Sequence, residues 1–292
     1  MIEQILVYGA ITGGVYALLA LGFTLIYGVS GVVNLAHGSF YMLGAYLFYV
    51  FGTLVFELPP ILSLILAVGS VGVMSSILYR LTIHPILGDE VGVMVATVCL
   101  ALIFQQLMLL IFGPPNVHIT SFITGSVTVW GLTLTYARIL AFTISLVLFT
   151  GLWLFISKSK IGKAMRAVSQ DREVAMLMGI NTEKLYMLVM AISSILAAIA
   201  GILIAGSITG VAGAWMWMYP LALSFSIVIL GGLGSIKGSL IGGFIIGYAE
   251  QTVAIAAPEG GAIIAVVPFT VMVLVLLLRP KGLFGKRIEM ED

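Results

Sequence analysis

Nine apolar segments follow one another along this chain with only short connections between them, and this pattern constrains the fold more than any other feature. A transmembrane helix needs about 20 apolar residues to cross about 30 Å of hydrocarbon. Segments of about that length lie at residues 4–28, 32–56, 61–82, 92–112, 134–157, 185–209, 219–234, 239–257 and 261–278. With 61% hydrophobic residues and a mean hydropathy of +1.20, a soluble domain could not cover its apolar surface. We expect an all-α, polytopic transmembrane fold, one domain over residues 1–292 with about 8–10 membrane segments.

Residues 219–234 form the shortest of these segments and end in Gly231-Gly232-Leu233-Gly234. A half-helix or re-entrant element is an alternative to a full crossing here, since irregular backbone is tolerated at depth where protein or water surrounds it. A faint internal repeat also lays Leu21–Phe40 over Leu223–Leu240. Transporters are often built from such repeats.

The basic residues give an orientation. Of the 13 Lys and Arg, six lie in residues 158–184 and four in 279–287, at Lys158, Lys160, Lys163, Arg166, Arg172, Lys184, Arg279, Lys281, Lys286 and Arg287. The positive-inside rule puts both intervals in the cytoplasm. Counting segments backwards then places the N-terminus outside, with Arg80 and Lys237 inside and Arg138 at an outer end. The C-terminus is expected to be cytoplasmic.

The interval 158–184 predicts a short helix with an apolar surface. Asp171 and Glu173 favour a helix N-terminus, and Gly179 lies where a helix of about two turns would end. Between them Val174–Met178 is apolar, although nothing in a cytosolic loop requires it. One interpretation is a docking surface for a partner; the other is an ordinary charged loop that only sets topology.

Enzyme signatures are missing from the chain. There is no GxxxxGK[ST] phosphate loop, no HExxH and no GxSxG. The single cysteine, Cys99, excludes a disulfide framework and a cysteine metal cluster. We therefore expect no catalytic residues, no metal and no cofactor.

Four polar residues inside the apolar segments are candidates for a translocation pathway or gate: Asn34, His37, Gln105 and Glu250. Asn34 and His37 share a helical face, or Asn34 caps a helix that begins at Leu35; either way a structural interhelical hydrogen bond is the alternative to a pathway role. Gln105, like its neighbour Gln106, fits an interhelical hydrogen bond or the pathway wall.

Glu250 belongs to a stripe of small residues, with Ser239, Gly243 and Gly247 at helical spacing before it. Small residues at this spacing allow another helix to pack closely, as do the pairs Gly9/Gly13 and Gly238/Gly242. An acid near the middle of the bilayer costs a few kcal/mol unless it is paired, protonated or hydrated. Alternatively, the helix is shifted and Glu250 lies near its outer end.

Four long segments resemble a known family: Val15–Tyr46, Lys160–Leu185, Ser224–Glu250 and Leu276–Gly285. They are similar to the permease subunits of bacterial and archaeal ABC importers for branched-chain amino acids, in particular the H-type permease of the Liv system. The resemblance implies a multi-pass protein of the cytoplasmic membrane that works by alternating access. It implies as partners a second homologous permease, two cytosolic ATPase subunits and an extracytoplasmic solute-binding protein.

In that family the loop matching residues 160–185 carries the helix that docks on the ATPase. The resemblance thus assigns ATPase coupling to Arg166, Asp171, Glu173, Val174, Met176, Leu177, Met178 and Gly179. A stand-alone secondary transporter of a small neutral solute, with Glu250 or His37 carrying protons, is the alternative.

Overall fold

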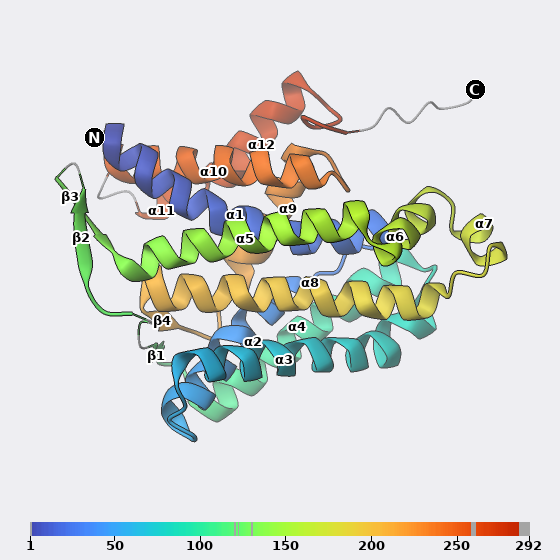
Figure 1. Ribbon diagram of the computed structural model, residues 1–292, viewed down its shortest axis with the longest axis horizontal. Helices are drawn as coiled ribbons and strands as arrows, with labels where there is room; N and C mark the ends of the chain where they lie inside the picture. Colours follow the sequence, from blue (N-terminus) through green and yellow to red (C-terminus); the bar gives the residue numbers. More distant parts are fainter. Residues whose placement is uncertain (1, 120, 122, 130, 258–260, 286–292) are drawn as a thin grey trace.

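The computed structural model describes residues 2–119, 121, 123–129, 131–257 and 261–285. Two basic residues used for orientation, Lys286 and Arg287, lie outside the described residues. The described chain is a bundle of roughly aligned helices, with a small strand region at one end and two short helices, α6 and α7, at the other (Figure 1).

Six helices of the described chain are long and apolar enough to cross a membrane. They are α1 (Ile2–Ser30), α3 (Pro60–Leu78), α4 (Glu90–Phe112), α5 (Tyr136–Lys158), α8 (Thr182–Ile204) and α10 (Ile236–Ala256). One-turn π-helices extend two of them, η2 (Tyr79–Ile83) after α3 and η4 (Ala205–Thr209) after α8. The prediction of an all-α polytopic membrane fold is confirmed.

Shorter helices complete the bundle. They are α2 (His37–Tyr49), η1 (Val50–Leu54), η3 (His84–Ile86), α6 (Lys160–Gln170), α7 (Arg172–Leu177), α9 (Met218–Gly231), α11 (Gly261–Ile264) and α12 (Val267–Leu278). The 14 residues of α9 span about 21 Å, less than the hydrocarbon thickness of about 30 Å. The short helix over this segment fits the half-helix alternative for residues 219–234.

The strands of the described residues form two antiparallel pairs at the end of the bundle opposite α7 (Figure 1). Strand β1 (Val117–His118) pairs with β4 (Val211–Ala212), and β2 (Ser126–Val129) forms a hairpin with β3 (Leu132–Thr135), in which Ser126 is opposite Thr135. These pairs satisfy backbone groups in the connections outside the helices.

Helix ends follow local sequence signals. Asp89 caps α4 by accepting from the Gly92 N–H at 3.0 Å, and Ser235 caps α10 by accepting from the Gly238 N–H at 3.1 Å. Such caps satisfy one of the N–H groups that a helix start leaves without a partner. The boundaries therefore come from side chains in the connections and not from the apolar runs alone.

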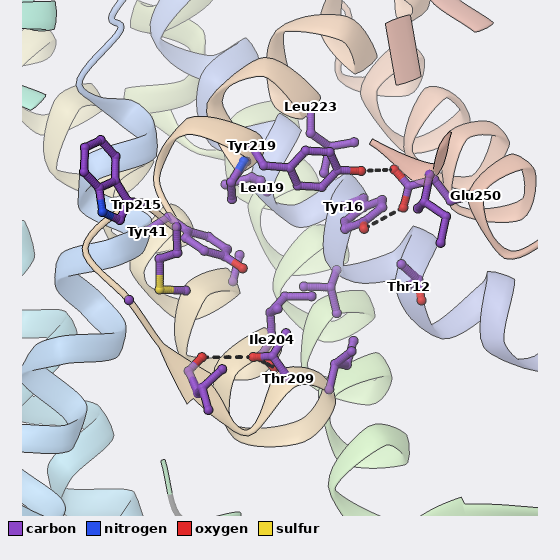
Figure 2. Close-up of a pocket in the computed structure, with 18 of the residues that line it drawn as sticks. Thr12, Tyr16, Leu19, Tyr41, Ile204, Thr209, Trp215, Tyr219, Leu223 and Glu250 are labelled. Atoms are coloured by element: carbon purple, nitrogen blue, oxygen red, sulfur yellow. Dashed lines mark hydrogen bonds between the residues drawn. The ribbon is translucent and has the colours of Figure 1, made fainter. Parts of the chain in front are cut away.

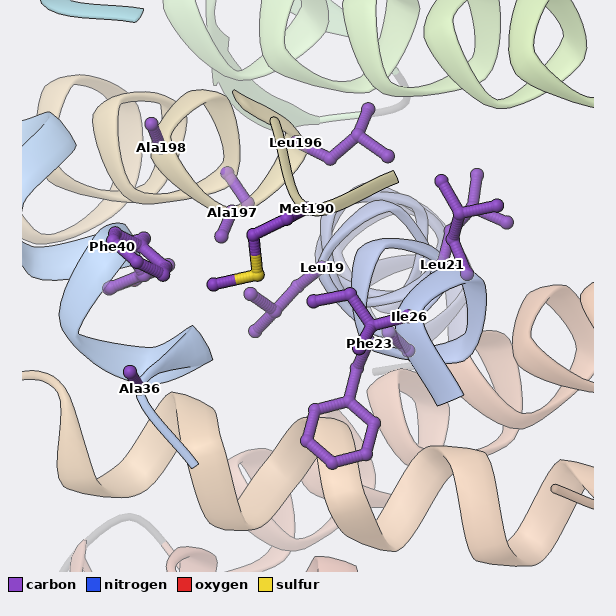
Figure 3. Close-up of a cluster of buried hydrophobic side chains, with 14 of the residues drawn as sticks. Leu19, Leu21, Phe23, Ile26, Ala36, Phe40, Met190, Leu196, Ala197 and Ala198 are labelled. Carbon is purple, nitrogen blue, oxygen red and sulfur yellow. The ribbon is translucent and has the colours of Figure 1, made fainter. Parts of the chain in front are cut away.

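The core forms around α1, which packs against α5, α8, α9 and α10. Leu19 and Phe23 of α1 lie in a buried cluster with Phe40 of α2 and Met190 and Ala197 of α8 (Figure 3). Because α1 contacts four helices that follow it in the chain, it holds them together around the core.

The chain repeats one order of elements. The helix α1 ends before Gly31, at φ +71°, and an irregular stretch leads to the short α2 and then to α3 and α4. Similarly, α8 with η4 ends before Gly210, at φ +70°, and leads to the short α9 and then to α10 and α12. The packing repeats as well, since α1 lies along α10 and α8 lies along α3.

These two halves run in opposite directions. Gly31 lies in a cavity wall with Arg172 at the α7 end, whereas Gly210 lies beside Ile119 in the strand region. The alignment of Leu21–Phe40 with Leu223–Leu240 is therefore out of register by one helix, because it matches the end of α1 with the end of α9. Repeats of inverted topology are common in transporters.

The chain after α12 turns back onto α9. The N–H groups of Leu283 and Phe284 donate to the carbonyl oxygens of Leu230 and Gly231, at 2.9 and 3.0 Å. Gly282 lies against the backbone of Ile229 and Gly232, where a Cβ would overlap it. The last described residues thus hold the end of α9.

Candidate functional site

A cavity of about 570 Å³ lies between α1, α8, α9 and α10 (Figure 2). Most of its wall is apolar, with Leu19 from α1, Ile204 from α8 and Leu223 from α9. The volume lies in the range of about 300–1,000 Å³ that is typical of small-molecule sites. Its few polar groups include Tyr16, Tyr219 and Glu250, which come together on one side of the cavity.

Glu250 of α10 is the charged group of this cavity. Its side chain is 3% exposed, and Tyr16 of α1 donates a hydrogen bond to Oε2 at 2.7 Å while Tyr219 of α9 donates to Oε1. Figure 2 shows the two hydroxyl groups on the same side of the carboxylate, each directed at a different oxygen. A buried carboxylate is costly in a membrane unless donors or a cation stabilise it, and here two hydroxyl donors do so.

Close packing of α1 on α10 brings Glu250 to Tyr16. Gly243 lies against Ala17, Gly247 lies against Gly13, and the hydroxyl groups of Ser239 and Thr24 are hydrogen-bonded. The predicted stripe therefore faces a closely packed helix, as expected. Since α10 continues to Ala256, Glu250 lies six residues before its end, which fits the alternative of a position toward one end of the helix.

The short helix α9 brings the second tyrosine. Trp217, just before α9, donates from Nε1 to Oε1 of Gln105 on α4 at 2.6 Å. This bond fits the structural interpretation of Gln105 as a hydrogen-bonding residue between segments, whereas Gln106 is exposed on α4. With Trp217 held by α4, Tyr219 in the first turn of α9 is directed to Glu250.

A second, smaller cavity of about 350 Å³ shares Thr12, Ile208 and Gln251 with the first. Gln251 donates from Nε2 to Oγ1 of Thr12 at 3.4 Å, across the shared wall. Arg138 lines the second cavity with its guanidinium 5.0 Å from the centre of the Tyr8 ring. The two neighbouring cavities thus carry groups of opposite charge.

Asn34 and His37 do not line the large cavity. His37 is fully buried at the start of α2, with Nε2 3.0 Å from the Leu19 carbonyl and Nδ1 3.3 Å from the Ser193 hydroxyl. It therefore connects α2 to α1 and α8, as in the structural alternative.

Asn34 precedes α2 and does not share a helical face with His37. Its Oδ1 accepts from the Ala36 N–H at 3.0 Å and its Nδ2 donates to Met190 Sδ at 3.4 Å. The helix begins at His37, two residues later than the capping alternative assumed, because the stretch from Gly31 to Ala36 remains irregular.

All residues assigned to coupling except Arg166 lie in α7 or directly next to it. Asp171 accepts from the Val174 N–H at 2.9 Å, and Gly179, at φ +85°, ends the turn after the helix. Both features were predicted from the sequence. Glu173 lies in the first turn and is exposed, where an acid favours the helix N-terminus.

The apolar residues of α7 face away from the protein. Val174, Met176, Leu177 and Met178 are exposed, Leu177 at 86% and Met178 at 80%. Only Ala175 turns inward, into the core. Ala175 holds the helix against the bundle. The apolar outer face of the helix is exposed in the described chain.

The helix α6 was not predicted from the sequence, where residues 160–170 stand out only for their lysines and arginine. Ser159 caps it by accepting from the Gly162 N–H at 2.9 Å, and Met165 and Val168 are its buried side. Arg166 on α6 donates to the carbonyl oxygens of Ile156 and Ser157 at the end of α5. Its described contacts therefore join α6 to α5.

Tyr16 and Tyr219 were also missed. Both lie in apolar segments that appear uniform in hydropathy, and tyrosine is common at helix packing surfaces. The available signal was the hydroxyl group itself, since a buried tyrosine hydroxyl needs a hydrogen-bond partner. The sequence contains Glu250 as an acceptor but does not indicate which tyrosines reach it.

Comparisons with known proteins agree with this architecture. The family described as "Branched-chain amino acid transport system / permease component" matches residues 5–276. The chain is 32% identical over 296 residues to the high-affinity branched-chain amino acid transport system permease protein BraD of Pseudomonas aeruginosa, covering 97% of this chain and 95% of BraD. It is 31% identical over 291 residues to the corresponding protein LivH of Escherichia coli, covering 95% and 94%.

Among solved structures, the chain is similar to PsaBC from Streptococcus pneumoniae in complex with Fab, with a TM-score of 0.54, 12% identity, and 95% and 92% of the two chains covered. At this identity the likeness concerns the fold alone. Together these findings define a multi-pass membrane permease. The chain belongs to the family of permease components of branched-chain amino acid transport systems; it is a transport component and not an enzyme.

Proposed function

We propose that this chain is the membrane-spanning permease subunit of an ABC importer that carries branched-chain or other hydrophobic amino acids by alternating access. ATP hydrolysis takes place in two separate cytosolic subunits, and a second homologous permease and an extracytoplasmic solute-binding protein complete the system. Residues 1–292 act as one permease domain, with 158–184 as its coupling loop.

The single observation that carries this proposal is the outer face of α7. A capped helix of six residues, outside the long apolar helices, exposes Leu177 and Met178 almost completely. Methionine adapts well to a groove on a partner, and exposed apolar patches mark interaction sites. The inward-facing Ala175, with Arg172 5.7 Å from the centre of the Tyr186 ring of α8, fastens α7 to the bundle. Movement of a bound ATPase would therefore reach α8.

The distribution of basic residues supports a cytosolic position for α7. Phe284, from the interval after α12, lines one cavity together with Arg172, so the two basic intervals are close in space. Arg80 precedes His84, which lies 3.9 Å from Glu183 at the start of α8. Of the described basic residues, Arg138 alone lies at the opposite end. By the positive-inside rule the α7 end is cytosolic and the N-terminus is outside.

Asn34, His37, Gln105 and Glu250 take two roles in this proposal. Glu250 lines the cavity through which the solute passes. His37, Gln105 and Asn34 bond to residues of the other inverted half, so they couple the movements of the two halves. Rigid helices joined in this way transmit a displacement at one end to a gate at the other.

Reconstitution tests the proposal. The chain is co-expressed with the partner subunits from its own system, purified and placed in liposomes with the binding protein and radiolabelled leucine. We expect uptake only with ATP and all partners, and a loss of at least about tenfold in Leu177→Asp, because a buried unpaired charge costs several kcal/mol at an interface. Val73→Asn, on an exposed face of α3, is the control for general damage.

Leucine accumulation by the isolated chain in liposomes, without ATPase partners, would instead favour the stand-alone secondary transporter. The family assignment favours the ABC importer. Unchanged ATP-dependent uptake in Leu177→Asp would exclude α7 as the docking surface.

A further inference from the structure

Glu250 carries a negative charge into the wall of a cavity, and the described chain provides no cation for it. We propose, building on the transport function above, that the cavity is a substrate station in which Glu250 binds the α-ammonium group of the amino acid. Tyr16 and Tyr219 are positioning residues that hold the carboxylate for this contact.

The lack of a cationic partner for Glu250 within the described residues leads to the assignment of the ammonium group to this site. Within the described residues the one contact between a basic and an acidic side chain joins His84 and Glu183, and Glu250 has no basic side chain beside it. Both of its oxygens accept hydrogen bonds from hydroxyl groups, an arrangement that suits the ionised carboxylate. A buried charge is normally paired, and the ammonium group of a substrate supplies the missing partner.

The carboxylate also retains room to bind. An ionised carboxylate offers about four acceptor positions, and the two tyrosines use one on each oxygen. An ammonium group has three N–H donors and forms short charge-assisted hydrogen bonds with carboxylates. The remaining positions can thus accept it without displacing Tyr16 or Tyr219.

The rest of the wall suits an aliphatic side chain. Leu19, Ile204 and Leu223 face the cavity from three different helices, and Figure 2 shows them around the space beside the tyrosines. Apolar area removed from water contributes about 25 cal/mol per Å². A neutral branched amino acid therefore meets a charged anchor on one side and apolar surface on the other.

The test measures binding without the solute-binding protein, whose own specificity would otherwise dominate. The permease complex is placed in lipid nanodiscs without nucleotide and titrated while tryptophan fluorescence is recorded, since Trp215 lines the cavity. The probes are leucine, leucinamide, which keeps the ammonium group, and 4-methylpentanoate, which lacks it. We expect saturable binding of leucine and leucinamide, and binding of 4-methylpentanoate at least about tenfold weaker, as the loss of a charge-assisted hydrogen bond implies.

Glu250→Gln should weaken leucine binding by about tenfold or more and remove the preference for leucinamide over 4-methylpentanoate. Glu90→Gln, an exposed acid at the start of α4, is the matched control. Tyr219→Phe should weaken leucine less than Glu250→Gln does and keep the preference for the ammonium group, because the carboxylate remains.

Equal binding of leucine and 4-methylpentanoate to the unaltered complex would overturn the proposal, and this comparison needs no variant to fold. Equal leucine affinity in Glu250→Gln and the unaltered complex would also overturn it. Either result would leave ATP-dependent leucine uptake in liposomes intact, whereas failure of the proposed function would abolish that uptake in the unaltered complex.

Discussion

Gly247 of α10 lies directly against Gly13 of α1, so closely that a Cβ on residue 247 would overlap the backbone of Gly13. The contact lies one turn from Glu250 and sets the distance between the two helices that meet at the cavity. Small residues at such positions let helices approach where a membrane provides no hydrophobic drive for association.

Replacing Gly247 by leucine should therefore separate α1 from α10. Overpacking typically costs about 1–3 kcal/mol, so we expect a lower melting temperature of the purified permease and weaker leucine uptake. Gly151→Ala on α5 is the control, because nothing lies within 4 Å of the added Cβ and alanine favours a helix by about 1 kcal/mol over glycine. Equal melting temperatures of the two variants would contradict the prediction that the close approach of Gly247 to Gly13 stabilises the packing of α1 on α10.

His37→Ala should destabilise the permease by about 1–3 kcal/mol, because it removes a fully buried hydrogen-bonding side chain. The Leu19 carbonyl and the Ser193 hydroxyl both lose a partner, and Ser193 keeps only its hydrogen bond to the Gly22 carbonyl. Thermal unfolding in detergent measures the effect, with the exposed His118→Ala as control. Loss of uptake with unchanged stability would instead indicate a direct role of His37 in the pathway.

Gln105 and Trp217 should be energetically coupled. A double-mutant cycle with Gln105→Leu and Trp217→Phe is expected to give an interaction energy of about 0.6 kcal/mol, the average for interhelical hydrogen bonds in a membrane protein, and at most about 1.7 kcal/mol. Unfolding in a mixed micelle series provides the four free energies. Strict additivity would show that the 2.6 Å contact does not stabilise the fold.

Asp171→Ala should loosen α7 without affecting membrane insertion. The Asp171 carboxylate caps the helix through the Val174 N–H, and removal of such a cap costs about 0.5–2 kcal/mol. We expect leucine uptake per ATP hydrolysed to fall in reconstituted vesicles. Asp171→Asn keeps a capping side chain and should retain most of the coupling; equal losses in both variants would point to the charge and not the cap.

The apolar segments, the capping side chains and the glycines of the sequence predicted much of this fold. The nine apolar segments all correspond to helices, the glycine motif after residue 230 marked the short α9, and Asp171 and Gly179 marked both ends of α7. In each case the signal is local: a run of apolar residues, a capping side chain or a glycine. Local signals of this kind can be recognised in a single sequence.

Relationships between distant residues were not accessible in the same way. Tyr16 and Tyr219 are 234 and 31 residues from Glu250, and no local pattern connects them. The sequence repeat rests on similar residue types in Leu21–Phe40 and Leu223–Leu240. The structural repeat instead matches α1 with α8, and it is recognised from the two glycines Gly31 and Gly210 and from which helices pack together. The helix α6 was missed because its apolar positions are sparse between lysines and arginines, which hide a helical period.

The return of the chain onto α9 has a practical consequence for anyone who modifies the C-terminus. Leu283 and Phe284 bond to the last turn of the helix whose first turn carries Tyr219. A truncation before Gly282 would free that helix at one end and disturb the acid it contacts at the other. Purification tags and fluorescent reporters therefore belong beyond residue 285, joined through a spacer.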